Sequence, residues 1–422
     1  MTPDARRRPT RALAAFCALW TLLLFPLFSA AQTAPPADAG ADLEVALITV
    51  GPGEEVWERF GHNAILITLH AAPRPTELLF NYGMFDFAQE NFYLNFARGR
   101  MLYRIATSEP AEDFAMYRAE GRWIVRQDLN MSPAQRSALF AYLSDNALPE
   151  HAQYRYEYFT ANCSTRVRDA LNDALGGAIK AQTIAPSRGF TYRMDTLRLM
   201  RAEPLLMLGM DAGLGPFADQ RLTYWDESFV PMEFMRHVRD VRLADDHGGT
   251  QPLVARETLL AKARLAEPPD FPPNWVWQAL AIGIAAAFCL LGLARLRARA
   301  WARAAFALGA SAIALVCGLG GVTLIVLWTL TDHISAWRNE NLLLLDPLCL
   351  LLLPAWAGSL RRRWQPSTFA RRVAVAIAAF AGLAFFIKVF PAFTQDNRLW
   401  IALLLPLHVA LALSAVLARN AR

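Results

Sequence analysis

Charged residues are scarce in this sequence: Asp, Glu, Lys and Arg make up 19% of its 422 residues, against about 25% in a typical soluble domain. The shortfall lies in the C-terminal third, where long apolar runs follow one another, and this excludes a wholly soluble protein. Residues 32–273 are acidic, with 24 Lys and Arg against 32 Asp and Glu, a difference of −8. A nucleic-acid-binding domain needs a basic surplus on a folded face, so we expect no nucleic-acid partner.

Motifs for metals and nucleotides are missing as well. The sequence has no H-E-x-x-H motif and no cysteine pair at the spacing of metal ligands, and its histidines are dispersed. It has neither a phosphate-binding G-x-x-x-x-G-K-S/T loop nor a dinucleotide fingerprint. We therefore expect no metal and no cofactor.

The N-terminus has the pattern of a secretory signal peptide over residues 1–31. Arginines at Arg6–Arg8 and Arg11 precede the apolar stretch Leu13–Phe28, and the small residues Ser29–Ala31 follow it. This order is typical of a cleaved signal peptide; the alternative is an uncleaved anchor. In both cases the domain that follows is exported.

Five later segments are apolar and have roughly the length needed to cross a hydrocarbon core of about 30 Å. They form a predicted five-helix transmembrane domain over residues 275–417. The segments are Trp275–Leu293, Ala305–Leu327, Leu342–Leu360, Val373–Val389 and Leu399–Leu417.

Arginine clusters predict the orientation of these segments. The clusters lie within Arg295–Arg303, Arg361–Arg372 and Arg419–Arg422, and positively charged loops stay in the cytoplasm. Five spans then put the preceding domain outside and the C-terminus inside. We expect a multi-pass protein of the bacterial inner membrane with a periplasmic domain.

The predicted periplasmic domain, residues 42–267, is long enough for one substantial core. Short β-branched or aromatic segments predict strands, while a proline start and a Ser-Pro cap predict helices over Glu109–Gly121 and after Ser132. The fold class is therefore α+β. The expected strands are Val45–Val50, Gly61–Leu69, Leu78–Tyr82, Met101–Ala106 and Trp123–Leu129.

Cysteine is also rare, and only one falls in this domain. Of five cysteines, Cys163 alone lies outside the signal peptide and the apolar segments. It sits at the start of a predicted helix that is capped by Asn162 or Thr160. A lone thiol in an oxidising compartment is a candidate nucleophile, and the positive end of a helix stabilises its thiolate. The alternative is an inert buried cysteine.

A histidine base would complete a Cys–His site for acyl chemistry. His62 opens the second expected strand behind Gly61, so its ring lies at the edge of the sheet; a purely structural histidine is the alternative. Asn81 and Asp86 are candidates to orient the imidazole, or else ordinary turn residues. We favour Asn81 because its strand can pair beside the strand of His62.

Three motifs resemble the Lnb-type family of lipoprotein N-acyltransferases: WERFGHNAILI from Trp57, NYGMFDF from Asn81, and YFTANCSTRVRDAL from Tyr158. The multi-span C-terminus resembles that family too. The resemblance implies a papain-like, permuted NlpC/P60-like domain, in which Cys163 is the acyl-accepting nucleophile and His62 its base. It leaves the third residue open, because the related branch often has a histidine where this sequence offers Asn81.

Polar residues of the domain and of the apolar region are candidates for contact with substrate or with the membrane. They are Asn162 and Asp86 in the domain, and Asp332, His333, Glu340, Asn341 and Asp346 near the outer membrane face. The alternative for the outer five is ordinary interfacial polarity. Residues 188–234, rich in Met, Leu, Phe, Trp and Pro, are either a cap on the membrane surface or ordinary core.

These observations predict a cysteine-dependent acyltransferase at the membrane. The resemblance implies that a phospholipid donates an acyl group to Cys163 as a thioester, and that the N-terminal diacylglyceryl-cysteine of a lipoprotein accepts it. The partners are thus a phospholipid, a lipoprotein and membrane lipids. Two alternatives remain: a membrane-tethered cysteine peptidase or amidase acting on cell-wall peptides, and a non-catalytic membrane assembly factor.

Overall fold

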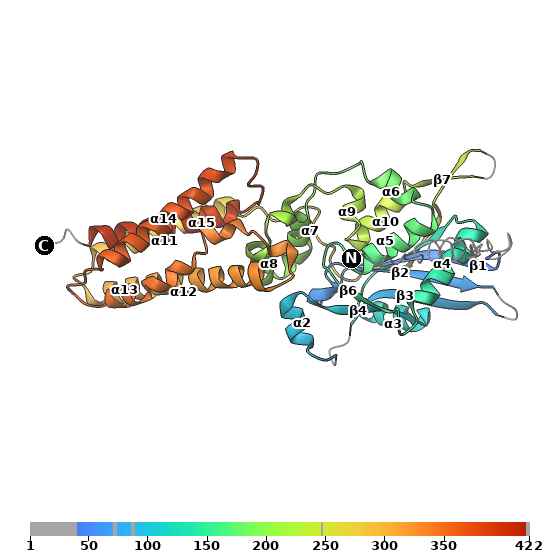
Figure 1. The fold of residues 1–422 in the computed structure, drawn as a ribbon, viewed down its shortest axis with the longest axis horizontal. Coiled ribbons are helices and arrows are strands. Elements are labelled where there is room, and N and C mark those ends of the chain that lie inside the picture. The colour runs from blue at the N-terminus through green and yellow to red at the C-terminus, as the bar shows by residue number, and fades with distance from the viewer. Residues whose placement is uncertain (1–39, 71–73, 86–88, 246–247, 419–422) are drawn as a thin grey trace, which may run out of the picture.

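The computed structural model describes residues 40–70, 74–85, 89–245 and 248–418. A sheet with its covering helices lies at one end of the molecule and a bundle of long helices at the other (Figure 1). The signal peptide and Asp86 lie outside the described residues. The α+β domain followed by a helical region confirms the predicted fold class.

The N-terminal domain is built on a seven-stranded sheet in the order β6-β4-β3-β2-β1-β5-β9. Its neighbouring strands pair antiparallel throughout. All five expected strands are present, whereas the two at the sheet edges, β6 and β9, were not expected. The strands are β1 (Leu43–Val50), β2 (His62–Leu69), β3 (Thr76–Met84), β4 (Leu102–Ser108), β5 (Ile124–Leu129), β6 (Gln153–Arg155) and β9 (Val254–Ala261), and β7 (Arg242–Ala244) pairs with β8 (Thr250–Pro252) in a separate hairpin.

Helices cover both faces of the sheet. On one face, α4, α5 and α10 bury Leu139, Val167 and Phe234 against the strands. On the other, α3 contributes Phe114 and Tyr117. The helices of this domain are α2 (Phe92–Arg98), α3 (Pro110–Ala119), α4 (Pro133–Asn146), α5 (Cys163–Ala174), α6 (Ala178–Thr183), α7 (Tyr192–Leu199), α8 (Pro204–Gly213), α9 (Tyr224–Glu227) and α10 (Pro231–Val238), with 3₁₀ turns η1 (Val56–Glu58), η2 (Met200–Ala202) and η3 (Pro216–Asp219).

The C-terminal region is a bundle in which four helices are long and apolar enough to cross a membrane. Small residues line their contacts, and Ala310, Ala381 and Ala384 are fully buried, as expected where helix backbones approach closely in a membrane. The helices are α11 (Val276–Arg295), α12 (Ala300–Leu330), α14 (Thr368–Phe386), which continues into η7 (Ile387–Val389), and α15 (Arg398–Leu417).

The third expected span, Leu342–Leu360, is not one continuous helix. It consists of η5 (Glu340–Leu343), η6 (Pro347–Leu352) and α13 (Leu353–Gly358), and with η4 (Ile334–Ala336) it forms a helix pair bent by 45°. Pro347 cannot continue a preceding helix, and the Asp346 carboxylate caps η6 by accepting from Leu348 N at 2.9 Å. Among the described residues the bundle thus has four continuous helices that could cross a membrane, and a fifth candidate if the bent pair crosses as one.

The two parts of the molecule meet at α8 and the segment after α12. Asn339 Nδ2 donates to the carbonyls of Ala212 and Gly213, both at 2.9 Å, and Trp400 Nε1 donates to Asp211 Oδ2 at 2.9 Å. Within residues 188–234, α8 packs on the bundle, whereas Phe234 of α10 lies in the core of the sheet domain; a position on the membrane surface stays a prediction.

Candidate active site

Cys163 is the first residue of α5, which packs against β2 and β3. Asn162 caps the helix: its Oδ1 accepts from Thr165 N at 2.9 Å, and Thr165 Oγ1 accepts from Asn162 N at 2.8 Å. Val167, one turn on, is fully buried in the seam against the sheet. The sulfur therefore lies at the positive end of the helix, where a thiolate is favoured.

His62 is the first residue of β2, and the next residue fastens this strand to α5. Ser164 Oγ donates to Asn63 Oδ1 at 2.7 Å, and Asn63 Nδ2 donates to Thr49 Oγ1 at 2.8 Å. Asn63 and Ser164 are fully buried. These buried bonds keep His62 and Cys163, their immediate chain neighbours, side by side.

The thiol and the imidazole shift each other's ionisation. Burial opposes a charged thiolate, but the facing His62 imidazole, its hydrogen bond, and the backbone N–H groups of Asn63 and Ser164 hold the pKa of Cys163 below its ordinary value. Burial opposes an imidazolium too, but the charge and hydrogen bond of Cys163 raise the pKa of His62 above its ordinary value. The geometry thus favours a thiolate–imidazolium pair, the reactive form of a cysteine nucleophile.

Asn81 lies on the far side of the imidazole. It pairs with Ala64 in the β2–β3 register, as expected for neighbouring strands, and His62 Nε2 lies 2.9 Å from Asn81 Oδ1. An amide oxygen accepts only, so this contact places a proton on Nε2 and leaves Nδ1 for the sulfur.

Two residues that the sequence did not single out orient Asn81. Asn81 Nδ2 donates to Ser108 Oγ at 2.9 Å and to Asp113 Oδ2 at 3.0 Å, and Ser108 Oγ donates to the same carboxylate oxygen at 2.6 Å. Because a carboxylate can only accept, the amide nitrogen of Asn81 faces Asp113 and its oxygen faces His62. Ser108 ends β4 and Asp113 lies in the first turn of α3.

Gly83 lies directly against the nucleophile. It has φ +89°, and a Cβ built there would lie 3.1 Å from the Cβ of Cys163. A side chain at position 83 would therefore be strained in its backbone and would crowd Cys163. This position requires glycine for two separate reasons.

Comparison with protein families assigns both parts of the chain. Residues 37–202 match the model of the Lnb N-terminal periplasmic domain, and residues 273–420 match that of the Lnb transmembrane domain. The chain belongs to the Lnb family. No curated protein and no solved structure matches it. The expected family is confirmed, and this Lnb-family chain is a membrane protein with a periplasmic N-terminal domain.

In this Lnb-family protein, Asp332 and His333 connect the periplasmic domain to the bundle. Asp332 Oδ2 accepts from Arg100 Nε at 2.8 Å and from Arg155 Nη2 at 2.7 Å. These two guanidiniums hold the pKa of Asp332 below its ordinary value. His333 Nε2 donates to the Phe96 carbonyl at 3.1 Å. Both expected polar residues thus have structural contacts.

The other polar candidates of the Lnb-family chain are also engaged. Glu340 pairs with Lys388, and the buried Asn341 donates to the Ala212 carbonyl at 3.0 Å. Asn162 and Asp346 act as caps, as described above. Of the predicted residues that the structure describes, His62 and Asn81 thus join Cys163 in one group, whereas these four serve as caps or structural contacts.

Aromatic side chains extend from the candidate site to the bundle. Tyr103 and Tyr156 stack with ring centroids 4.0 Å apart, and burial together with the charge of Cys163 raises the pKa of Tyr103 to about 12. The ring centroids of Tyr156 and Tyr158 are 6.0 Å apart, and the ring of Tyr158 stacks on that of His333 with centroids 6.0 Å apart. We call Tyr103, Tyr156, Tyr158 and His333 the aromatic path.

A side branch joins the aromatic path to α2. Phe85 lies 5.3 Å from Tyr103 and 6.3 Å from Phe92, between ring centroids. The next residues of α2 expose apolar side chains, with Tyr93 80% and Phe96 48% accessible. Because Asp332 N donates to the Arg98 carbonyl at 2.8 Å, α2 lies level with the end of the membrane helix α12.

One group of side chains has the composition of a metal site. Glu227, Glu233 and His237 place ligand atoms within 4.8 Å of one another. Arginines already neutralise the carboxylates, however: Arg188 Nε lies 2.5 Å from Glu227 Oε1, and Arg198 Nη2 lies 2.7 Å from Glu233 Oε1. A buried carboxylate that is paired in this way does not need a metal ion, so we interpret the cluster as an ion-pair network.

Proposed function

We propose that this protein transfers an acyl chain from a phospholipid to the N-terminal amine of a lipoprotein, through a thioester on Cys163. The observation that carries the proposal is the position of the reactive pair. The charge of Cys163 acts on Tyr103 and Tyr156, and the aromatic path that begins with these rings ends at His333, beside the end of α12. A peptidase of the same chemistry has no need of such a path.

In the first half-reaction, the thiolate of Cys163 attacks the carbonyl carbon of a phospholipid ester. The ester C–O bond breaks, and the His62 imidazolium gives its proton to the departing lysophospholipid oxygen. The acyl group remains on sulfur as a thioester. Asn81 keeps the imidazole oriented for this transfer through its 2.9 Å contact with His62 Nε2.

In the second half-reaction, the α-amine of a diacylglyceryl-cysteine attacks the thioester carbonyl. His62, now neutral, accepts the proton that the amine loses, and the departing thiolate is again stabilised at the start of α5. The products are an amide on the lipoprotein and a regenerated Cys163–His62 pair. The two half-reactions balance without an oxidant, a metal or a cofactor.

The lipid character of the donor is supported by α2 and the aromatic path. Exposed Tyr93, Leu94 and Phe96 lie beside the outer end of α12, at the level where aromatic side chains favour the membrane interface. A phospholipid lifted slightly from the outer leaflet would place its ester near Tyr103 and Tyr156, while its acyl chains stay in contact with apolar surface.

The acceptor and the cellular location rest on the family. Lnb-type enzymes act on lipoproteins, and the free amine of a diacylglyceryl-cysteine is the nucleophile that a thioester at the membrane surface would meet. The arginine-rich far end of the bundle supports a bacterial inner-membrane location with the C-terminus in the cytoplasm.

Mass spectrometry of lipoprotein N-termini tests this function in cells where this protein is the source of N-acylation. We expect Cys163→Ala and His62→Ala to leave free α-amines while the protein is still made. Cys289→Ala is the matched control, because Cys289 lies exposed on α11, and it should leave N-acylation intact. Unchanged N-acylation in Cys163→Ala would overturn the proposal, as would cleavage of cell-wall peptides without acyl transfer.

A further inference from the structure

A second candidate binding site lies at the opposite end of the molecule from Cys163. It is a cavity of about 250 Å³ between the end of α11, the start of α12, the end of α13 and the end of α15. Figure 1 shows these helix ends at the side of the bundle away from the sheet. The cavity therefore opens at the membrane face opposite the periplasmic domain.

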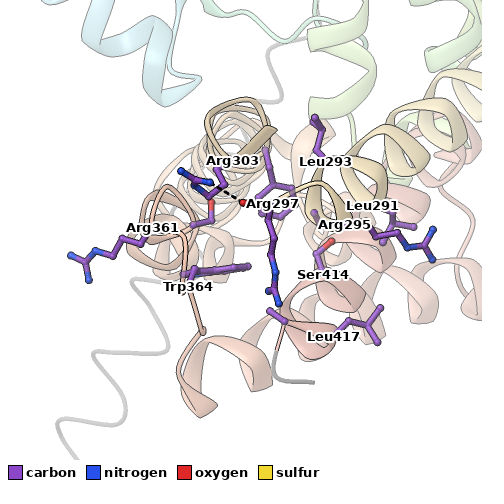
Figure 2. A pocket seen from close by; sticks show the side chains of 13 residues that line it. Leu291, Leu293, Arg295, Arg297, Arg303, Arg361, Trp364, Ser414 and Leu417 are labelled. Atoms are coloured by element: carbon purple, nitrogen blue, oxygen red, sulfur yellow. Dashed lines mark hydrogen bonds between the residues drawn. The ribbon is translucent and has the colours of Figure 1, made fainter. Parts of the chain in front are cut away.

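Arg297 occupies the middle of this cavity. Figure 2 shows its side chain running through the hollow, with Trp364 on one side and Ser414 and Leu417 on the other, whereas Arg295 and Arg361 point outward. Arg297 is half-buried, and within the described part of the chain its guanidinium has no hydrogen-bond or ion-pair partner. Placing five N–H donors without acceptors in a partly buried site is unfavourable.

Arg303 belongs to the wall instead. Its Nη1 donates to the Arg297 carbonyl at 2.9 Å and its Nε to the Leu360 carbonyl at 2.9 Å. These bonds fix the loop between α11 and α12 and hold it against the end of α13. The cavity is thus shaped by hydrogen bonds that leave the Arg297 guanidinium without a partner among the described residues.

Among the described residues, no side chain supplies negative charge to this end of the bundle. No Asp or Glu occurs between residues 271 and 331, or between residues 347 and 395, or after Asp396. The cavity lining includes four arginines and no acidic residue. No acidic side chain of the described residues therefore neutralises Arg297, which leaves its guanidinium available to an anionic ligand.

The side chains that line the cavity indicate which kind of anionic ligand would bind Arg297. Leu291, Leu293, Phe306 and Leu417 line the same cavity as the arginines, and Trp364 has the amphipathic ring that favours a membrane interface. A ligand with an anionic head and apolar chains matches this lining. Topology signals alone require only positive charge near helix ends; they do not require an unpaired guanidinium inside an apolar-walled cavity.

We propose that this cavity binds the phosphodiester headgroup of an anionic phospholipid from the leaflet opposite the active site. Arginine suits a phosphate because its planar donors pair with two oxygens at once, and basic pockets between membrane helices on the cytoplasmic side bind such headgroups. The volume is below the range of about 300–1,000 Å³ for drug-sized ligands. It therefore fits a headgroup, with the acyl chains lying outside along α11 and α15.

Thermal unfolding of the full-length protein in neutral detergent tests this site. We expect phosphatidylglycerol to raise the unfolding temperature by about 5 °C at saturation, and phosphatidylcholine to raise it much less, because a ligand that binds only the folded state stabilises it. Arg297→Gln should lose most of the phosphatidylglycerol effect, and Arg297→Lys should keep part of it. Arg362→Gln is the matched control, because Arg362 is exposed nearby and does not line the cavity.

The unfolding temperature without lipid shows whether each variant is folded. An equal phosphatidylglycerol shift in Arg297→Gln and the wild type would overturn the proposal. So would a loss in Arg362→Gln as large as that in Arg297→Gln, because the effect would then be non-specific. Equal stabilisation by inorganic phosphate alone would overturn the assignment to a lipid. These outcomes do not depend on acyl transfer, so they stand apart from the proposed function.

Discussion

The nucleophilicity of Cys163 depends on other side chains, because burial alone would keep its thiol protonated. His62 and two backbone N–H groups reverse that tendency and lower the pKa of Cys163. The thiolate of Cys163 is therefore favoured at lower pH than that of a free cysteine, whose pKa is about 8.5.

Alkylation of Cys163 by iodoacetamide as a function of pH measures this shift directly. The wild type should show its rate midpoint below about 8.5, since the thiolate persists at lower pH when the pKa is lowered. In His62→Ala the midpoint should rise above that of the wild type, because burial then acts without an opposing charge. A midpoint that is the same in both proteins would contradict the ion pair.

Asp113 should act through Asn81 as a positioning residue. In Asp113→Asn the Asn81 amide is no longer held in one orientation, so we expect acyl transfer to fall about tenfold, less than the roughly 10²–10⁴-fold contribution of a positioned acid–base group. The alkylation midpoint of Cys163 should also rise. Glu112→Gln, an exposed neighbour on the same helix turn, is the control; an unchanged pH profile in Asp113→Asn would leave Asp113 without this role.

The sequence predicts Cys163, His62 and Asn81 because each carries a local signal: a lone exported thiol, a strand start after glycine, and a neighbouring strand. Ser108 and Asp113 carry no such signal. Their contact with Asn81 depends on how β3 pairs with β4 and on where α3 crosses the sheet. Those long-range arrangements cannot be derived from spacing along the chain.

At the scale of elements, the start of α5 combines a cap with a tertiary anchor. Asn162 accepts from Thr165 N through Oδ1, and its Nδ2 donates to the carbonyls of Tyr158 and Phe229 at 3.0 and 2.8 Å. One side chain thus positions the helix end that carries Cys163 and also satisfies two buried carbonyls.

Removing this cap should destabilise the periplasmic domain. We expect Asn162→Ala to cost about 2 kcal/mol, from the lost cap and the unsatisfied carbonyls, and to lower the unfolding temperature by roughly 4–8 °C. Calorimetry of the full-length protein checks this, with Asn274→Ala as a control because the side chain of Asn274 is exposed. Equal unfolding temperatures for both variants would contradict the anchoring role.

The short β-branched and aromatic segments of the sequence predicted the five central strands. The signal is clear where a strand is buried, as most residues of β1 and β2 are. The edge strand β9 was missed since most of its residues are exposed and no periodic apolar pattern marks it. The break in the third span was missed for a different reason. Mean hydropathy over Leu342–Leu360 is high, but Asp346 and Pro347 together end one helical turn and start another.

At the scale of the whole molecule, the site is useful only if the periplasmic domain stays at a fixed height above the membrane. Asp332, just past the end of α12, holds Arg100 and Arg155 of that domain. Because its pKa is lowered, this carboxylate stays ionised even below the ordinary Asp pKa, and the contact weakens only as the pH falls toward the lowered pKa.

Asp332→Asn should loosen this connection. We expect the backbone amides of α2 and residues 331–333 to exchange hydrogen several-fold faster at pH 7, and acyl transfer from membrane phospholipid to fall. Asp396→Asn is the control, because Asp396 pairs with Arg398 within the bundle. If exchange in these segments is unchanged in Asp332→Asn, the two ion pairs do not hold the domain in place.

The most direct test of the account is intact-protein mass spectrometry of the full-length protein after mixing with phospholipid alone. We predict one added acyl chain on Cys163, which hydroxylamine removes as it removes thioesters, and which disappears on addition of a diacylglyceryl-cysteine peptide as that peptide gains an amide-linked chain. Transfer to the peptide in wild-type protein without any acyl group on Cys163, or undiminished transfer in Cys163→Ala, would contradict the account.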